Sequence, residues 1–188
     1  MVESDKIYPM YRDIILSNRI AEQFINNSNY VENPIIIQTI DHVCVSLLNT
    51  NRERTLSFFW GSVCPELRKK YSNNNFEISI WAKHNEKYYF CGCALGRNDD
   101  HGDYCSIDYI EKYNDIPDWI HGKLAYISFI CLNSLAIISN RKNLRIYQPN
   151  PRFLNKIQSV LSNRPYTTGQ DLHDSCQYIE FPAETLST

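Results

Sequence analysis

The feature that most constrains the fold is the order of periodic segments between residues 76 and 160. Residues 76–81 and 88–96 are two strand-like runs, and the polar residues 85–87 between them are suited to a turn. Together they predict a β-hairpin. A third strand is expected at 104–111, after a polar loop. This part of the chain is therefore expected to form a largely antiparallel sheet.

An apolar segment at 124–138 follows Gly122 and ends in the polar, basic residues 140–143. It is shorter than the roughly 20 residues that a helix needs to cross a bilayer. Its apolar side chains nearly encircle a helical axis, which indicates a helix that lies across a sheet and is covered on its other side. A further strand is expected at 143–148 and a further helix at 151–160.

The first part of the chain carries weaker signals. A rough helical spacing of apolar residues predicts a helix over 10–24, and the run 34–40 predicts a strand. Short helices are expected at 54–60 and at 64–71. No Gly/Ser-rich or Pro-rich linker divides the 188 residues, so one domain covering residues 1–188 is expected.

Composition limits the classes of partner. The net charge of −2 gives no general attraction to nucleic acid or to an anionic membrane, and neither is expected as a partner. Basic residues gather in the second half of the chain, where they form either solvated faces or a patch for a ligand that carries phosphates. The acidic, polar start of the chain lacks the pattern of a signal peptide, and a cytoplasmic protein is expected.

The seven cysteines are an odd number and lie mainly in apolar runs, as expected of reduced, buried thiols. Cys91 and Cys93 are two apart on one predicted strand, so alternation places both on one face, where Cys105 of the next strand could approach them. No Cys-x-x-Cys or His-x-x-x-His pair occurs in the sequence, and no metal site is expected.

This order of elements resembles the GNAT superfamily of acyl-CoA-dependent N-acyltransferases. The resemblance implies an α/β fold of the α+β type, with a mixed, mostly antiparallel central sheet flanked by helices. Residues 35–188 would form the acyltransferase-like core, and residues 1–34 an extra N-terminal helical extension. The pieces that carry the resemblance are residues 78–81, 91–97, 107–111, 121–123 and 144–150.

The resemblance also implies a site for acetyl-CoA. In GNAT proteins two strands splay apart, and the pantetheine arm bonds to the free edge of the first; the resemblance places these strands at 107–111 and 144–148. The pyrophosphate lies on amides at the start of the following helix, where the helix dipole favours an anion. The alternative is that Gly122 merely starts a helix, because only one glycine of the family motif is present. The cofactor-binding residues implied are Tyr109, Ile110, Glu111, His121, Gly122, Lys123, Leu124, Ala125 and Asn150.

Catalysis requires a base for the amine and an acid for the leaving thiolate. Glu111 is expected to be the base or the anchor of the amine, with Asp108 as second choice; alternation along one strand would turn these carboxylates to opposite faces. The family's thiolate-protonating tyrosine falls within the helix at 151–160, where this chain has Ile157 instead. Tyr147, Tyr166 or water would then supply the proton.

Two functions follow from these observations. The first is an N-acyltransferase that moves an acetyl group from acetyl-CoA to a primary amine by direct attack in a ternary complex. The second is a GNAT-like domain without catalysis, which acts as a binding or regulatory subunit through protein contacts of the N-terminal helix. The expected partners are acyl-CoA and an amine acceptor, with a protein partner or a homodimer left open.

Overall fold

The computed structural model describes residues 9–50, 75–99, 101–160, 164–171 and 175–185. Its helices are α1 (Pro9–Asn27), α2 (His42–Thr50), α4 (Leu124–Ile138) and α5 (Pro151–Val160), with a short 3₁₀ helix η1 (Asp118–Ile120). Its strands are β1 (Ile35–Gln38), β2 (Asn75–His84), β3 (Lys87–Asp99), β4 (Tyr104–Ile107), β5 (Tyr109–Lys112), β6 (Asn143–Tyr147), β7 (Thr167–Gln170) and β8 (Gln177–Pro182). The short helices expected at 54–60 and 64–71 lie outside the described residues.

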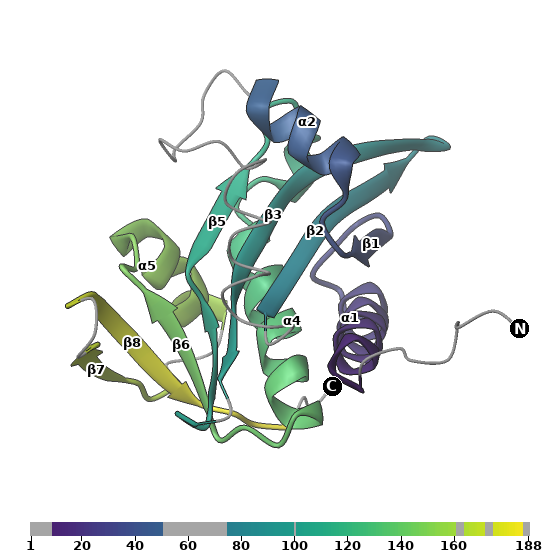
Figure 1. Cartoon of the computed structure of the whole chain (residues 1–188). Helices are drawn as coiled ribbons and strands as arrows, with labels where there is room; N and C mark the ends of the chain where they lie inside the picture. Colours follow the sequence, from purple (N-terminus) through teal and green to yellow (C-terminus); the bar gives the residue numbers. More distant parts are fainter. Residues whose placement is uncertain (1–8, 51–74, 100, 161–163, 172–174, 186–188) are drawn as a thin grey trace, which may run out of the picture.

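The described strands form one mixed sheet in the order β1-β2-β3-β4-β6-β8-β7, with β5 paired to β3 (Figure 1). Among the strands that the structure describes, only β4 and β6 pair in parallel. The expected mixed, mostly antiparallel sheet flanked by helices is therefore confirmed.

The predicted hairpin is formed by β2 and β3. Asn85 and Glu86 make its two-residue turn, and both have positive φ angles, 48° and 60°, as the tightest hairpin turns require. The pairing of the two strands shifts between Ile80 and Trp81, where Cys91 is the extra residue. This bulge interrupts the alternation of side chains along β3.

The bulge contradicts the expectation that Cys91 and Cys93 share a face. Cys91 packs in the main core, whereas Cys93 packs in a smaller apolar cluster on the other face of the sheet. We call the second group the α2 cluster, because α2 and its approach supply half of its buried residues: Ile40, Cys44, Leu48, Phe90, Cys93 and Leu95.

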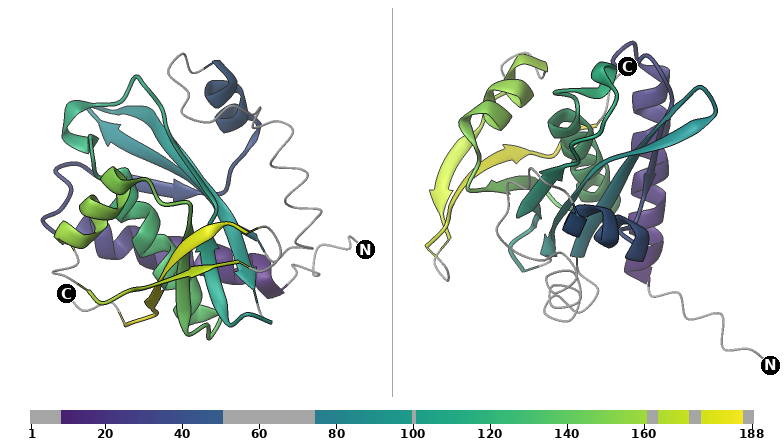
Figure 2. Two further views of the ribbon diagram at one scale, coloured as in Figure 1. Left: turned by 90° about the vertical axis from the view of Figure 1, so that its left-hand side faces the viewer. Right: turned by 90° about the horizontal axis from the view of Figure 1, so that it is seen from above.

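The main core lies between the sheet and the helices α1, α4 and α5, while α2 lies on the other side of the strands (Figure 2). Almost every side chain of α4 is buried, which confirms the prediction from its nearly continuous apolar sequence. Phe129 of α4 meets Phe181 of β8 edge to face, with ring centroids 5.2 Å apart. No helix in the described part of the chain is both long and apolar enough to cross a membrane.

Helix α1 packs against α4 and also covers the outer edge of β1 (Figure 1). The Asn26 carboxamide accepts a hydrogen bond from Ile35 N and donates one to Ile35 O, both of 2.9 Å. The Glu22 carboxylate accepts a hydrogen bond of 2.8 Å from Ile37 N. Side chains of α1 thus occupy backbone groups that an edge strand would otherwise present to a partner.

The strand expected at 104–111 is divided at Asp108. Its first part, β4, pairs in parallel with β6, and its second part, β5, pairs only with β3 among the described strands. Beyond the pair Ile107 and Ile146, β5 and β6 separate (Figure 1). The chain therefore opens a gap in the middle of an otherwise continuous sheet.

Candidate active site

A cavity of about 570 Å³ lies where β5 and β6 diverge. One wall is formed by β5 and the residues just before it, the other by the end of β6 and the start of α5, and the first turn of α4 closes one side. The edge of β5 that faces away from β3 borders this space, so backbone amide groups lie along the wall.

Most of the residues expected to bind the cofactor line this cavity. They are Tyr109, Ile110, Gly122, Leu124, Ala125 and Asn150, and Asp108 and Tyr147 line it as well. Glu111, His121 and Lys123 do not belong to the lining. The Lys123 ammonium instead lies 5.7 Å from the centroid of the Tyr30 ring, in the segment between α1 and β1.

The start of α4 is suited to an anion. Gly122 has a φ of 73°, a left-handed conformation that glycine adopts without strain. Lys123 is the N-cap residue, and its side chain makes no capping hydrogen bond to the first turn of the helix. The amide groups at such a helix end lack partners within the helix and carry the positive end of its dipole.

Two cations at this cavity were missed by the sequence reasoning. Lys112, at the end of β5, and Arg152, in the first turn of α5, both line it. Each was placed in a general basic half of the chain, because nothing in the sequence shows that the ends of β5 and α5 converge. Their convergence adds positive charge to the cavity that already contains the start of α4.

Asn150 has a structural role in addition to its place in the cavity. Its Oδ1 accepts a hydrogen bond of 2.9 Å from the backbone N of Arg152, so Asn150 caps the N-terminus of α5. Pro151 occupies the first helical position, where its missing N–H costs nothing. The sequence Asn-Pro therefore fixes where this wall of the cavity begins.

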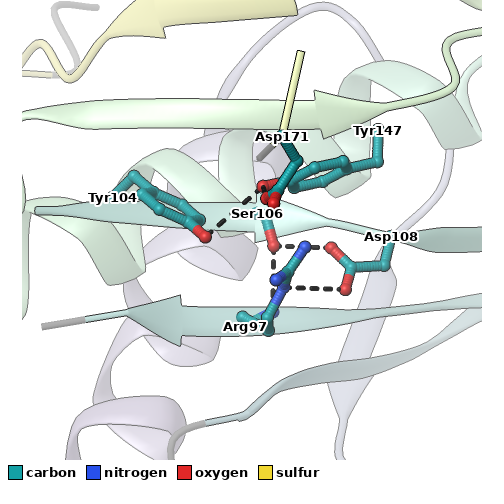
Figure 3. Close-up of polar contacts among 6 residues, drawn as sticks. All are labelled: Arg97, Tyr104, Ser106, Asp108, Tyr147 and Asp171. Atoms are coloured by element: carbon teal, nitrogen blue, oxygen red, sulfur yellow. Dashed lines mark hydrogen bonds and ion pairs between the residues drawn. The ribbon is translucent and has the colours of Figure 1, made fainter. Parts of the chain in front are cut away.

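A polar network lies at the point where the two strands part (Figure 3). The Asp108 carboxylate accepts a hydrogen bond of 2.6 Å from Ser106 Oγ and pairs with Arg97, whose Nε lies 3.0 Å from Asp108 Oδ2. The Asp108 and Arg97 side chains are 11% and 15% exposed. Asp108 is thus held as the ion-pair partner of Arg97, and both side chains are largely covered.

Tyr147 belongs to the same network. Its hydroxyl donates a hydrogen bond of 2.8 Å to Asp171 Oδ2 and lies 3.3 Å from the hydroxyl of Tyr104 (Figure 3). Burial, followed by the hydrogen bonds to Tyr104 and Asp171, raises the pKa of Tyr147 well above its ordinary value. The phenol is therefore a weak acid in this environment.

Glu111 is buried, with 1% of its surface exposed. An unbroken strand would have placed it on the face opposite Asp108, and this expectation is wrong because the strand is broken. Tyr109 packs against the α2 cluster and Ile110 against the main core, so Glu111 returns to the α2 face. Asp108 lies on that face too, through its pairing with Arg97, two residues after Leu95 of the α2 cluster.

Ile157 faces the main core and is completely buried. A tyrosine at this position of α5 would have to place its hydroxyl among apolar side chains of the core. The side chains of Tyr147 and Ile157 therefore differ in their access to the cavity, since only Tyr147 belongs to its lining.

Burial disfavours the reactive thiolate form of several cysteines. Burial raises the pKa of Cys91 to about 12 and raises the pKa of Cys105 and Cys131 still further above the ordinary value of a thiol. No group of three or more His, Cys, Asp or Glu side chains that could hold a metal ion occurs within the described ranges.

Comparisons with known proteins find similar structures but no similar sequences. No family model matches the sequence, and no curated protein matches it. Solved structures do match. The ribosomal-protein-S18-alanine N-acetyltransferase from Escherichia coli is 11% identical, with a TM-score of 0.53 over 81% of this chain and 96% of that chain.

Two further structures are similar to the same extent. An acetyltransferase of the GNAT family from Staphylococcus aureus is 10% identical, with a TM-score of 0.52 over 80% of this chain and 99% of that chain. The spermidine N-acetyltransferase from Vibrio cholerae, solved in complex with CoA and spermine, is 11% identical, with a TM-score of 0.54 over 79% of this chain and 95% of that chain. The chain therefore has the fold of these N-acetyltransferases, the GNAT fold.

Proposed function

We propose that the protein is an N-acyltransferase that transfers an acetyl group from acetyl-CoA to a primary amine by direct attack in a ternary complex. The observation that carries the proposal is the cavity between β5 and β6, which combines a strand edge, an uncapped helix start and two cations. These are the groups that an amide-bearing arm and an anionic pyrophosphate require. The likeness to N-acetyltransferase structures supports it.

In this proposal coenzyme A would lie in the cavity in one orientation. Backbone groups of Tyr109 and Ile110 would bond the pantetheine arm, and the first turn of α4 after Gly122 would hold the pyrophosphate. Lys112 and Arg152 would compensate the remaining phosphate charge. When bound, acetyl-CoA supplies the acetyl group as a reactive thioester.

Glu111 is proposed as the base or the anchor of the acceptor amine. It is buried and lies on the same face of the sheet as the break at Asp108. A buried carboxylate attracts an ammonium group strongly and can take its proton as the amine attacks. Asp108 is less suited to this role, because its carboxylate is already paired with Arg97.

The proposal is tested first by calorimetric titration with acetyl-CoA, and then by chromatographic detection of CoA released in the presence of primary amines. Glu111→Gln should lower turnover by about 10²–10⁴-fold while leaving the affinity for acetyl-CoA nearly unchanged. Glu77→Gln is the matched control, since Glu77 is a buried carboxylate of β2, a strand that contributes no residue to the cavity lining, whereas β5 does. Absence of acetyl-CoA binding at millimolar concentration would refute the proposal and leave the binding or regulatory role.

A further inference from the structure

The break between β4 and β5 is fixed by contacts from β3. Asp108 is the residue between the two strands, and its backbone N donates a hydrogen bond of 2.8 Å to Leu95 O. Its carboxylate is held by Ser106 and Arg97, at 2.6 Å and 3.0 Å. The backbone of Asp108 is thus held by β3, and its side chain is held by both β3 and β4.

The neighbouring residues show that regular pairing is replaced here. The backbone N of Arg97 donates a hydrogen bond of 3.2 Å to Ser106 Oγ, a side-chain oxygen in the place of a strand carbonyl. At Gly96 the two strands come so close that a Cβ atom would lie 1.8 Å from Ser106 O. Only glycine permits this approach, which draws β4 against β3 just before β5 begins.

Arg97 also contacts the opposite wall of the cavity. Its guanidinium lies 4.5 Å from the centroid of the Tyr147 ring, and Tyr147 is the last residue of β6. The hydroxyl of that ring is held by Asp171 at 2.8 Å (Figure 3). One side chain therefore joins Asp108, on the wall formed by β5, to Tyr147, on the wall formed by β6.

We infer, on the basis of the proposed function, that Arg97 is a positioning residue: together with Asp108 and Tyr147 it holds the strands at the angle that admits the pantetheine arm. The three side chains meet at the apex of the gap, before β5 and β6 separate. Removing the guanidinium would leave the Asp108 carboxylate buried without its cation, so the break would rearrange. A shift of β5 would misplace the backbone groups proposed to bond the arm.

Loss of Arg97 should therefore weaken the binding of only one half of the cofactor, the pantetheine arm. Adenosine 3′,5′-bisphosphate carries the nucleotide but no pantetheine arm, so its affinity should not depend on the strand edge. The affinity for CoA should depend on it. This split separates a positioning role from general loss of stability, which would affect both ligands alike.

The test uses Arg97→Met, Asp108→Asn and the double variant. The double variant removes both charges, so it leaves no buried charge without its partner. The control is the double variant Lys142→Met with Asp103→Asn, which removes an ion pair that joins the starts of β6 and β4, at the other end of the same two strands. Lys142 Nζ lies 2.9 Å from Asp103 Oδ2, and neither residue belongs to the lining of the cavity. Calorimetry gives the two affinities, and hydrogen exchange reports on residues 107–113 against residues 126–135.

The expected result for the Arg97 and Asp108 double variant is a loss of at least about tenfold in affinity for CoA, equivalent to one hydrogen bond. The affinity for the bisphosphate should change less than about twofold, and exchange should become faster at 107–113 but not at 126–135. The control should leave all three measurements as in the parent protein. Unchanged exchange at 107–113, or equal losses for both ligands, would overturn the inference. If the parent binds neither ligand, the proposed function fails and exchange alone decides whether Arg97 holds the break.

Discussion

Substitutions at Gly122 should separate the electrostatic role of the α4 start from its backbone conformation. Gly122 has a φ of 73°, which asparagine and aspartate tolerate better than other residues with a side chain. Gly122→Asn and Gly122→Asp therefore impose nearly the same shape and backbone cost. They differ in one negative charge at the edge of the cavity.

That charge determines the expected difference between the variants. A carboxylate about 5 Å from one phosphate charge is repelled by roughly 1–3 kcal/mol for effective dielectric constants between about 20 and 80. The Kd for acetyl-CoA should therefore be about 5- to 150-fold higher in Gly122→Asp than in Gly122→Asn. Both variants should bind more weakly than the parent, because either side chain occupies space beside the helix start.

Calorimetric titration at low and high salt is the assay. The difference between the two variants should shrink as ionic strength rises, because salt screens charges at a solvent-accessible site. Thermal unfolding of the variants without ligand serves as the control for altered stability. Equal affinities of Gly122→Asp and Gly122→Asn at low salt would show that no anion is bound at the start of α4.

Three further predictions concern stability and reactivity. Asp41→Ala should destabilise the protein by about 1 kcal/mol at pH 7, because Asp41 Oδ1 accepts a hydrogen bond of 2.9 Å from Cys44 N at the start of α2. That hydrogen bond lowers the pKa of Asp41, so the contribution is complete above the unfolded pKa of about 3.9 and is lost as pH falls through the lower folded value. Urea unfolding at several pH values measures this, and a constant difference between pH 7 and pH 3 would contradict it. Ile157→Tyr should cost roughly 1–3 kcal/mol in urea unfolding, because the site is fully buried, and it should not raise turnover; faster turnover at unchanged stability would show that position 157 reaches the cavity. Iodoacetamide at pH 8 should modify Cys176 before Cys91, since burial raises the pKa of Cys91 to about 12; peptide mapping with Cys91 modified first would contradict this.

Several assignments stay predictions after the structure is known. The division into residues 1–34 and 35–188 is one, although Ile14, Ala21 and Ile25 of α1 do pack in the main core. The roles of Glu111, Asp108 and Tyr147, a cytoplasmic location and a protein partner or homodimer are others. The acceptor amine is best sought with panels of primary amines in the CoA-release assay.

The sequence by itself determined the elements whose pattern is local. The hairpin of β2 and β3, the apolar helix α4 and the strand β6 follow from periodicity and turn residues, and their order was enough to indicate the GNAT fold. Most of the residues that the resemblance implied for the cofactor line one cavity, because the strand edge and the helix start are neighbours in that order.

Only the tertiary structure decided where these elements depart from regularity. The bulge at Cys91 and the break at Asp108 each reversed an expectation about which side chains share a face. Alternation assumes an unbroken strand, whereas the break depends on contacts with Arg97 and on the close approach at Gly96, which lie on another strand. The convergence of Lys112 and Arg152 on one cavity likewise requires that α5 begin across the cavity from the end of β5. Such contacts join residues distant in sequence, so their geometry arises only when the chain is folded.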